Sequence, residues 1–281
     1  MARISLPDRL LSYAVLCLVG TLMFAPFLYM ISIALSSDAT TVKAAFTLIP
    51  KEFALDNFVR VFTDYRMGTY LKNSVIITVF TVFGSVLSAS FVAYGFARIR
   101  AKGSGFLFIV LLSTMMLPGE VTMVPQFIIF RELGWINTLL PLIVPSFFAG
   151  AFNVFLIRQF VMGIPRSLDE AAMIDGMGHL GIYAKIILPL TYPILAAIGI
   201  FSFAWNWGNF MGPLIYINDP DKTPLALGVQ LISTVSGGQM PPWNMVMVAS
   251  LFLTVPMILV YTFGQKYVYE ANLNSGSAGL K

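Results

Sequence analysis

Charged residues are scarce in this chain. Lys and Arg number 17 and Asp and Glu 13 among 281 residues, which makes 11% charged, whereas an average soluble domain is about 25% charged. Hydrophobic residues make up 58% of the sequence, and this excess leaves too little polar surface to cover a water-soluble domain of this length. The composition therefore excludes an ordinary soluble enzyme and predicts a polytopic membrane protein.

Cysteine, histidine and nucleotide-binding motifs are equally scarce. The single cysteine, Cys17, excludes a disulfide framework and a cysteine zinc site. The single histidine, His179, excludes metal sites that need two imidazoles. No Gly-x4-Gly-Lys-Ser/Thr motif occurs, so this chain has no P-loop that could bind ATP. We therefore expect no catalytic residue, metal ligand or cofactor in this chain.

Six stretches are apolar for long enough to cross a bilayer core of about 30 Å, which takes roughly 20 helical residues. They are Leu10–Leu35, Ser74–Phe96, Phe106–Phe130, Leu139–Phe160, Pro193–Ile217 and Met245–Phe263. Prolines interrupt the third, at Pro118 and Pro125, which predicts a broken helix or one that lines a polar cavity. The predicted fold class is all-α, with about six transmembrane helices in one transmembrane domain over residues 1–281.

Basic residues decide which side of the membrane faces the cytoplasm. Six crossings put both termini on the same side as a short loop that carries Arg98, Arg100 and Lys102. Because short cytoplasmic loops have an excess of Lys and Arg, we expect both termini in the cytoplasm. The two longer loops are then residues 37–73 outside, with a helix-like stretch at Asp56–Phe62, and residues 162–192 inside.

The inner loop contains a short helix with recognisable ends. Ser167 and Glu170 have capping-box spacing, and Gly176 is placed to end the helix in a left-handed conformation. The spacing i, i+3, i+4, i+7, which places residues on one helix face, is found at Leu168, Ala171, Ala172 and Asp175. Two of these side chains are methyl-sized, so another protein can approach the backbone closely. These residues alone support two interpretations about equally: a capped interfacial helix in which Glu170 is only the capping acid, and a docking element for a cytoplasmic partner.

A longer pattern favours the docking interpretation. Glu170-Ala171-Ala172 is followed by three residues and Gly176, then by nine residues and Ile186-Ile187-Leu188-Pro189. This resembles the EAA loop, E-A-A-x3-G-x9-I-x-L-P, of ABC importer permease subunits. The resemblance implies that the loop forms a coupling helix seated in a cleft of the ATPase. The coupling residues it implies are Glu170, Ala171, Ala172, Asp175 and Gly176.

Shorter segments extend the resemblance over nearly the whole chain. These segments lie at residues 73–74, 93–98, 115–118, 133–138, 158–160, 223–228 and 265–267. Together they narrow the resemblance to the sugar-type branch of the family, which includes the smaller permease subunit of maltose transporters. The fifth span departs from the W-N-x-F-x-x-P-L pattern of such subunits, because Gly208 follows Trp207 and an asparagine precedes it at Asn206. The departure concerns substrate contacts and leaves the fold unaffected.

The resemblance also implies a location in a bacterial or archaeal inner membrane, a function and a set of partners. The chain would form half of an alternating-access pathway for a sugar or sugar-like solute, such as a di- or oligosaccharide, and a second related permease chain would form the other half. Two ATPase subunits would bind ATP and magnesium, and an extracytoplasmic solute-binding protein would deliver the solute. The outer segment Asn218–Trp243, with a turn at Asp219-Pro220-Asp221 and a flexible Gly237-Gly238 pair, is the expected receptor-facing loop.

Polar residues inside the spans mark a candidate solute pathway, because an unpaired polar group in hydrocarbon is costly. Amide groups beside aromatic faces suit a sugar ring, and the candidates of this kind are Asn209, Asn206, Trp207, Phe210, Asn153 and Glu120. The alternatives are interface anchoring for the aromatic residues and helix-to-helix hydrogen bonds for the asparagines. For Glu120 a gate, a receptor contact and an interface position are similarly compatible.

An ion-coupled secondary transporter that acts without an ATPase is the alternative function. It predicts paired charges deep in the spans and an internal inverted repeat. The sequence offers one acid of this kind, Glu120, and no evident repeat. An intramembrane enzyme is disfavoured because no paired acid and base or metal-ligating constellation is evident.

Overall fold

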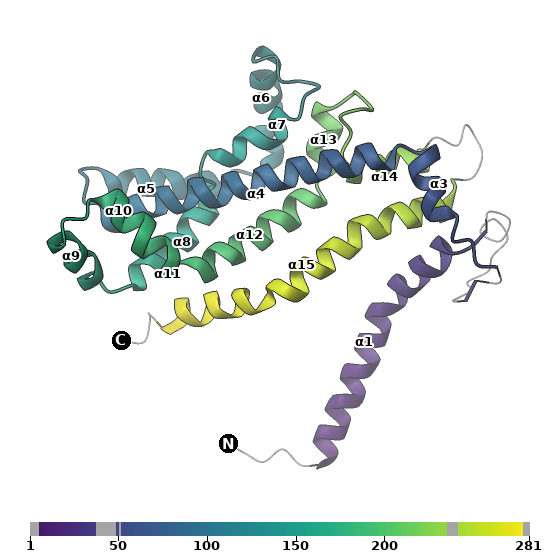
Figure 1. Cartoon of the computed structure of the whole chain (residues 1–281), viewed down its shortest axis with the longest axis horizontal. Helices are drawn as coiled ribbons and strands as arrows, with labels where there is room; N and C mark the ends of the chain where they lie inside the picture. Colours follow the sequence, from purple (N-terminus) through teal and green to yellow (C-terminus); the bar gives the residue numbers. More distant parts are fainter. Residues whose placement is uncertain (1–5, 38–48, 51, 235–240, 278–281) are drawn as a thin grey trace. The chain divides into compact units, whose positions relative to one another are not determined.

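The computed structural model describes residues 6–37, 49–50, 52–234 and 241–277. Within these residues all regular secondary structure is helical, apart from one isolated β-bridge that joins Ser36 to Phe53 (Figure 1). The all-α fold class expected from the sequence is thus confirmed. The chain divides into two compact units, the first within Met1–Gly68 and Gly228–Thr254 and the second within Thr69–Leu227 and Val255–Lys281.

Helices long and apolar enough to cross a membrane correspond to the predicted spans. By length and composition, the described residues contain four single spans: Arg9–Ala34, Met67–Arg98, Leu140–Gly163 and Trp243–Glu270. The first lies in α1 (Leu6–Ala34), the second is α4 (Met67–Arg98), and the fourth lies in α15 (Trp243–Ser277). The third consists of α7 (Leu140–Ile143), η2 (Val144–Phe147) and α8 (Ala151–Gly163). Two further stretches qualify as pairs of helices, one bent by 102° and the other by 75°. The count reaches the six expected spans when each bent pair is one span.

The third span is broken, as its prolines predicted. α5 (Ser104–Ser113) continues through the 3-10 turn η1 (Thr114–Met116), and the chain then turns by 102° into α6 (Gly119–Glu132). Leu117 and Pro118 are both extended at the bend, with ψ of 117° and 139°. A proline disfavours helical backbone in the residue before it, so the helix must stop at Met116 and start again after Pro118.

The fifth span is shorter at its end than the predicted Pro193–Ile217. α10 (His179–Ile182), a π-helical turn η3 (Tyr183–Ile187) and α11 (Leu188–Leu190) lead into α12 (Tyr192–Trp207) through the 75° bend. α12 ends at Trp207, and a separate helix α13 (Met211–Tyr216) follows. The prediction of one continuous helix to Ile217 was wrong: residues 208–210 separate the two helices, and at this break the Asn209 Oδ1 accepts the Gly212 N–H at 3.2 Å.

The first unit is organised by a buried asparagine. Asn57 opens α3 (Asn57–Asp64), the helix expected near residues 56–62, and is fully buried. Its Nδ2 donates to the carbonyls of Ala34 and Ser36, both at 2.9 Å, and its Oδ1 accepts from Asn244 Nδ2 at 3.3 Å. These bonds satisfy backbone groups at the end of α1 that the helix itself leaves unpaired.

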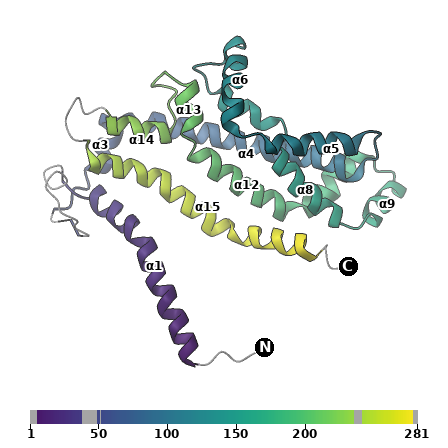
Figure 2. The ribbon, with the colours of Figure 1, turned by 180° about the vertical axis from the view of Figure 1, so that it is seen from behind.

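The main apolar core of the second unit is built by α4, α8 (Ala151–Gly163) and α12, and a smaller cluster surrounds Phe130 and Tyr216. Figure 2 shows these helices side by side. The fully buried side chains of the core belong to small and β-branched residues, among them Ala89, Ala93, Val154 and Ile198. Small side chains allow helices to approach closely where lipid supplies no hydrophobic drive to associate. The core extends into the 164–191 loop through Ala172, Ile182 and Ile187.

Gly84 marks the closest approach between α4 and η2 (Val144–Phe147). A methyl group at Gly84 would lie 2.7 Å from atoms of the Phe147 ring and from Ser146 Oγ, whereas one at Gly95, in the same helix, would meet nothing within 4 Å. Overpacking of this kind costs about 1–3 kcal/mol. We therefore expect Gly84→Ala to lower the thermal unfolding midpoint in detergent and Gly95→Ala to leave it unchanged or raised. Equal midpoints for the two variants would contradict this packing.

Candidate functional site

The helix predicted in the inner loop is present as α9 (Ser167–Ile174), and one of its sides packs against the rest of the second unit. Asp169 and Ala172 are buried, with 6% and 3% of their surface exposed. They are three residues apart and so share a helix face. Ala172 joins the core that α4, α8 and α12 build, which makes this face the inner side of α9.

Arg98, the last residue of α4, fixes α9 in place. Its Nε lies 2.8 Å from Asp169 Oδ2, with only 4% and 9% of the two side chains exposed. Its Nη2 also donates to the Ile164 carbonyl at 2.8 Å, just before α9 begins. Either charge buried alone would cost several kcal/mol, so the pair binds the end of α4 to α9 and the turn before it.

Two more arginines reach the same end of α4. Arg158 Nε donates to the Phe96 carbonyl at 3.4 Å, and Arg166 Nη2 donates to the Ala97 carbonyl at 3.5 Å. The Arg158 guanidinium also lies 4.2 Å from the centre of the Phe108 ring. Cations are favourable at the carboxyl end of a helix, where the dipole is negative. The end of α4 is therefore a junction between α5, α8 and the turn that leads into α9.

The opposite side of α9 is exposed. Glu170 and Ala171 are accessible, and Ile174 is 87% exposed. The predicted common face of residues 168, 171, 172 and 175 is correct for three of them, because only Ala172 turns inward. Helical spacing shows which residues share a side, but it does not show which side meets the chain's own core. Of the two methyl-sized side chains, Ala171 alone is available to another protein.

The two ends of α9 differ from each other in how well they were predicted. The capping box is not formed: the N-cap residue is Arg166 and it makes no side-chain cap. The Arg166 carbonyl already accepts the N–H groups of Asp169 and Glu170, at 3.0 and 3.1 Å, because the helix starts one residue earlier than the box requires. The predicted left-handed end is confirmed at Gly176, whose φ is +82°.

A Schellman motif completes that end of the helix. The Met177 N–H donates to the Ala172 carbonyl at 2.9 Å and the Gly176 N–H to the Met173 carbonyl at 3.0 Å, which is the paired pattern of this motif. It turns the chain back toward α4. There Tyr183 Oη shares a buried 2.8 Å hydrogen bond with Ser90 Oγ.

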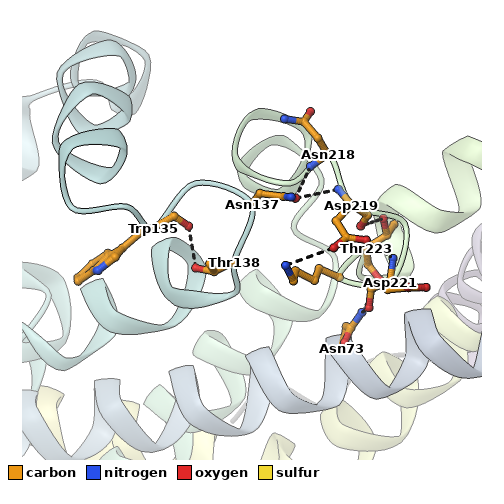
Figure 3. A network of polar contacts seen from close by, with 9 residues as sticks. Asn73, Trp135, Asn137, Thr138, Asn218, Asp219, Asp221 and Thr223 are labelled. Atoms are coloured by element: carbon orange, nitrogen blue, oxygen red, sulfur yellow. Dashed lines mark hydrogen bonds and ion pairs between the residues drawn. The ribbon is translucent and has the colours of Figure 1, made fainter.

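The other end of α4 holds a second polar network (Figure 3). Asn73 Nδ2 donates to the carbonyls of Asp221 and Thr223, at 2.9 and 3.0 Å. The next residue, Ser74, accepts the Leu225 N–H at its Oγ, at 2.7 Å. α4 thus holds residues 221–225, which lie within the expected receptor-facing segment.

Asn137 holds the same loop from a different element. It adopts a left-handed φ of +61° after α6, and its Oδ1 accepts the N–H groups of Asn218 and Asp219 at 3.1 and 2.8 Å. Asp219 Oδ1 in turn accepts the Asp221 N–H at 2.9 Å, which builds the turn expected at Asp219-Pro220-Asp221. The predicted Gly237-Gly238 pair lies outside the described residues.

Of the six candidate pathway residues, Trp207 lines a groove of about 860 Å³ between α4 and α12. Its ring stacks on Phe203 with a centroid distance of 5.4 Å. The groove is lined almost entirely by apolar side chains, with Thr78, Ser90 and Tyr192 as polar exceptions. The residues outside its lining are Asn153, Asn206, Asn209, Phe210 and Glu120.

These five residues lie at several places in the second unit. Asn206 Nδ2 donates to the Ser202 carbonyl at 2.8 Å, and Asn209 lies in the break before α13. Phe210 follows it at the break between α12 and α13, Asn153 lies half-buried in α8, and Glu120 is exposed in the first turn of α6. The structure therefore does not gather the six residues around this groove.

The polar contacts at both ends of α4 were missed as functional features. Asn73, Arg98, Asn137 and Thr223 all lie in segments that supported the family resemblance, yet nothing in the sequence showed what each contacts. Arg98 was counted only as a loop charge that fixes orientation. The available signal was an acidic residue on the short helix, Asp169, for which the capping box provided no role.

Comparison with known proteins agrees with this architecture. Residues 82–271 match the family model described as "Binding-protein-dependent transport system inner membrane component". The polygalacturonan/rhamnogalacturonan transport system permease protein YtcP of Bacillus subtilis (strain 168) is 32% identical over 94% of this chain and 93% of its own. The trehalose/maltose transport system permease protein MalG of Thermococcus litoralis is 31% identical over 90% and 93%.

A solved structure shows the same fold. A chain of a bacterial ABC transporter involved in the import of the acidic polysaccharide alginate superposes with a TM-score of 0.83 at 25% identity, and the match covers 95% of this chain and 99% of that one. The predicted resemblance to sugar-type permeases is confirmed, and the alternative of an ion-coupled transporter without an ATPase is removed. The chain belongs to the family of inner membrane components of binding-protein-dependent transport systems.

Proposed function

We propose that this chain is one of two permease chains of an ATP-driven importer and that α9 is the helix that docks on the ATPase. The observation that carries the proposal is the two-sidedness of α9. Its inner side is fixed by the buried Arg98–Asp169 pair, while Glu170, Ala171 and Ile174 are exposed on the other. A helix rigidly held on one side can transmit force applied to the other.

The solute of this importer is a saccharide. The relatives and the structural neighbour named above serve polygalacturonan or rhamnogalacturonan, trehalose or maltose, and alginate. These solutes are sugars of very different size and charge, so the class is better supported than any one member. Specificity is shared with the receptor and the second permease chain.

The orientation follows from the position of α9. If α9 meets a cytoplasmic ATPase, the end of α4 at Arg98 faces the cytoplasm, and the end at Asn73 faces outward, where the 218–225 turn can meet the solute-binding protein. Both termini then lie in the cytoplasm. ATP and magnesium belong to the two ATPase subunits, and hydrolysis there and receptor binding outside bias the same two-state pathway.

The apolar groove between α4 and α12 suits the second permease chain. Its lining offers few hydrogen-bonding groups to a saccharide, whereas an apolar surface of this size at membrane depth can pack against partner helices. We assign the saccharide pathway instead to the polar residues around the α12–α13 break, Asn206 and Asn209, with Trp207 and Phe210 beside them. Asn153 and Glu120 are the remaining members of this assignment.

Glu170 tests the docking role of α9. Removing one partner of a desolvated charge pair costs about 2 kcal/mol or more, so Glu170→Ala should weaken ATPase recovery and saccharide uptake about tenfold or more. The measurements are copurification of the ATPase through a tag on this chain, and uptake of labelled malto- and galacturono-oligosaccharides. Glu132→Ala, which changes another exposed glutamate, should alter neither. Normal uptake and ATPase recovery with Glu170→Ala would disprove the docking role.

Gly176 tests whether the shape of α9 is required. A side chain in the left-handed region costs roughly 1–2 kcal/mol, so Gly176→Ala should loosen the end of α9 and reduce ATPase copurification. The control is Gly178→Ala, because Gly178 has a φ of −77° and an added methyl group there would meet nothing within 4 Å. Equal ATPase recovery for the two variants would show that the Schellman end is dispensable.

Asn209 tests the pathway assignment. Its Oδ1 is used by Gly212, so the amide nitrogen is the group that a saccharide hydroxyl would meet. Asn209→Asp keeps the accepting oxygen and removes the NH₂ donor; it should lower uptake severalfold without changing the amount of assembled complex. Uptake unchanged across malto- and galacturono-oligosaccharides would remove Asn209 from the pathway.

A further inference from the structure

α4 connects two distant polar clamps without a break. It runs as one helix from Met67 to Arg98 and contains no proline. At about 1.5 Å per residue, the stretch from Asn73 to Arg98 is about 37 Å long, which exceeds the hydrocarbon core of a bilayer. Along its second half, its residues Ala89, Ala93 and Tyr94 are buried in the core.

Each clamp ties α4 to the backbone or the charge of another segment. At Arg98 the guanidinium holds Asp169 of α9 and the Ile164 carbonyl. At the opposite end, Asn73 holds the Asp221 and Thr223 carbonyls and Ser74 holds the Leu225 N–H. Asn73 and Ser74 are both buried. Because their partners are backbone groups, a shift of α4 cannot be absorbed there by side-chain rotation of the partner.

We propose that α4 is a strut that carries the position of α9 across the membrane to the 221–225 segment, with Arg98 and Asn73–Ser74 as its positioning residues. The proposal rests on the proposed function, because it takes α9 as the ATPase-facing helix. A continuous helix with an intact hydrogen-bond ladder moves as a body. Displacement of α9 by the ATPase therefore shifts the segment that faces the receptor.

Asn137 provides an internal contrast. It holds the same loop, through the N–H groups of Asn218 and Asp219, but it follows α6, which is separated from α5 by the 102° bend at Pro118. That bend interrupts any straight connection from α5 to Asn137. The strut thus predicts a graded response within one loop. The Leu225 amide, which is bonded to α4 itself, responds to α9 most strongly, and the Asn218 amide, which is bonded to Asn137, responds least.

Hydrogen exchange in the assembled transporter tests this difference. The complex is purified through a tag on this chain and placed in nanodiscs. Exchange is then compared between two states, one without nucleotide and one with ATP bound to a hydrolysis-deficient ATPase. In the unmodified chain, exchange at the Leu225 amide should change about fivefold or more between the two states. In the double variant Arg98→Gln/Asp169→Asn, which removes the ion pair without leaving one buried charge uncompensated, that difference should fall below about twofold. The ATPase should still copurify, because Ala172 continues to pack α9 against the core.

Asn137→Ala is the matched control. It should speed exchange at Asn218 and Asp219 in both states and leave the nucleotide-dependent difference at Leu225 in place. A difference at Leu225 that persists in the double variant Arg98→Gln/Asp169→Asn overturns the strut, and so does its absence from an unmodified complex that imports saccharide; the proposed function stands in either case. An unmodified chain that recovers no ATPase overturns both.

Discussion

Two charges that leave water must compensate each other, and in this chain the pair that does so is Arg98 and Asp169. They meet at 2.8 Å with both side chains almost fully buried. Replacing either by a neutral residue leaves an uncompensated charge, a loss of about 3–5 kcal/mol. Such a pair adds little net stability compared with apolar packing, but it favours one arrangement of the segments it joins.

The contacts of the second unit follow from this constraint. Once Arg98 fixes the inner side of α9, Ala172 enters the core and Glu170 and Ile174 are left outside. The glycine end at Gly176 then returns the chain toward α4, where Tyr183 bonds Ser90. A short helix of eight residues would be marginal in water by itself, so its stability comes from this anchoring.

The sequence was informative where one residue type has one conformational consequence. Hydropathy located the spans, Pro118 predicted the broken third span, and Gly176 predicted the left-handed end of α9. It was uninformative where the outcome depends on a distant partner. Asp169 resembles any first-turn acid until Arg98 is beside it, and the capping box failed because Arg166 already satisfied the backbone. Asn73 and Asn137 were part of recognisable segments, but the loop they hold is 148 residues away from Asn73 along the chain.

That separation has a consequence for how the protein is made. Domains and segments fold in the order of synthesis, so α4 is in the membrane before α9 and the 221–225 segment have been translated. Asn73 and Arg98 therefore precede their partners, and each later segment arrives at a surface that is already formed. The long-range contacts, slow to find in a free chain, are then made against a helix that is already in place, and Ser74 accepts its hydrogen bond only once Leu225 has been added to the chain.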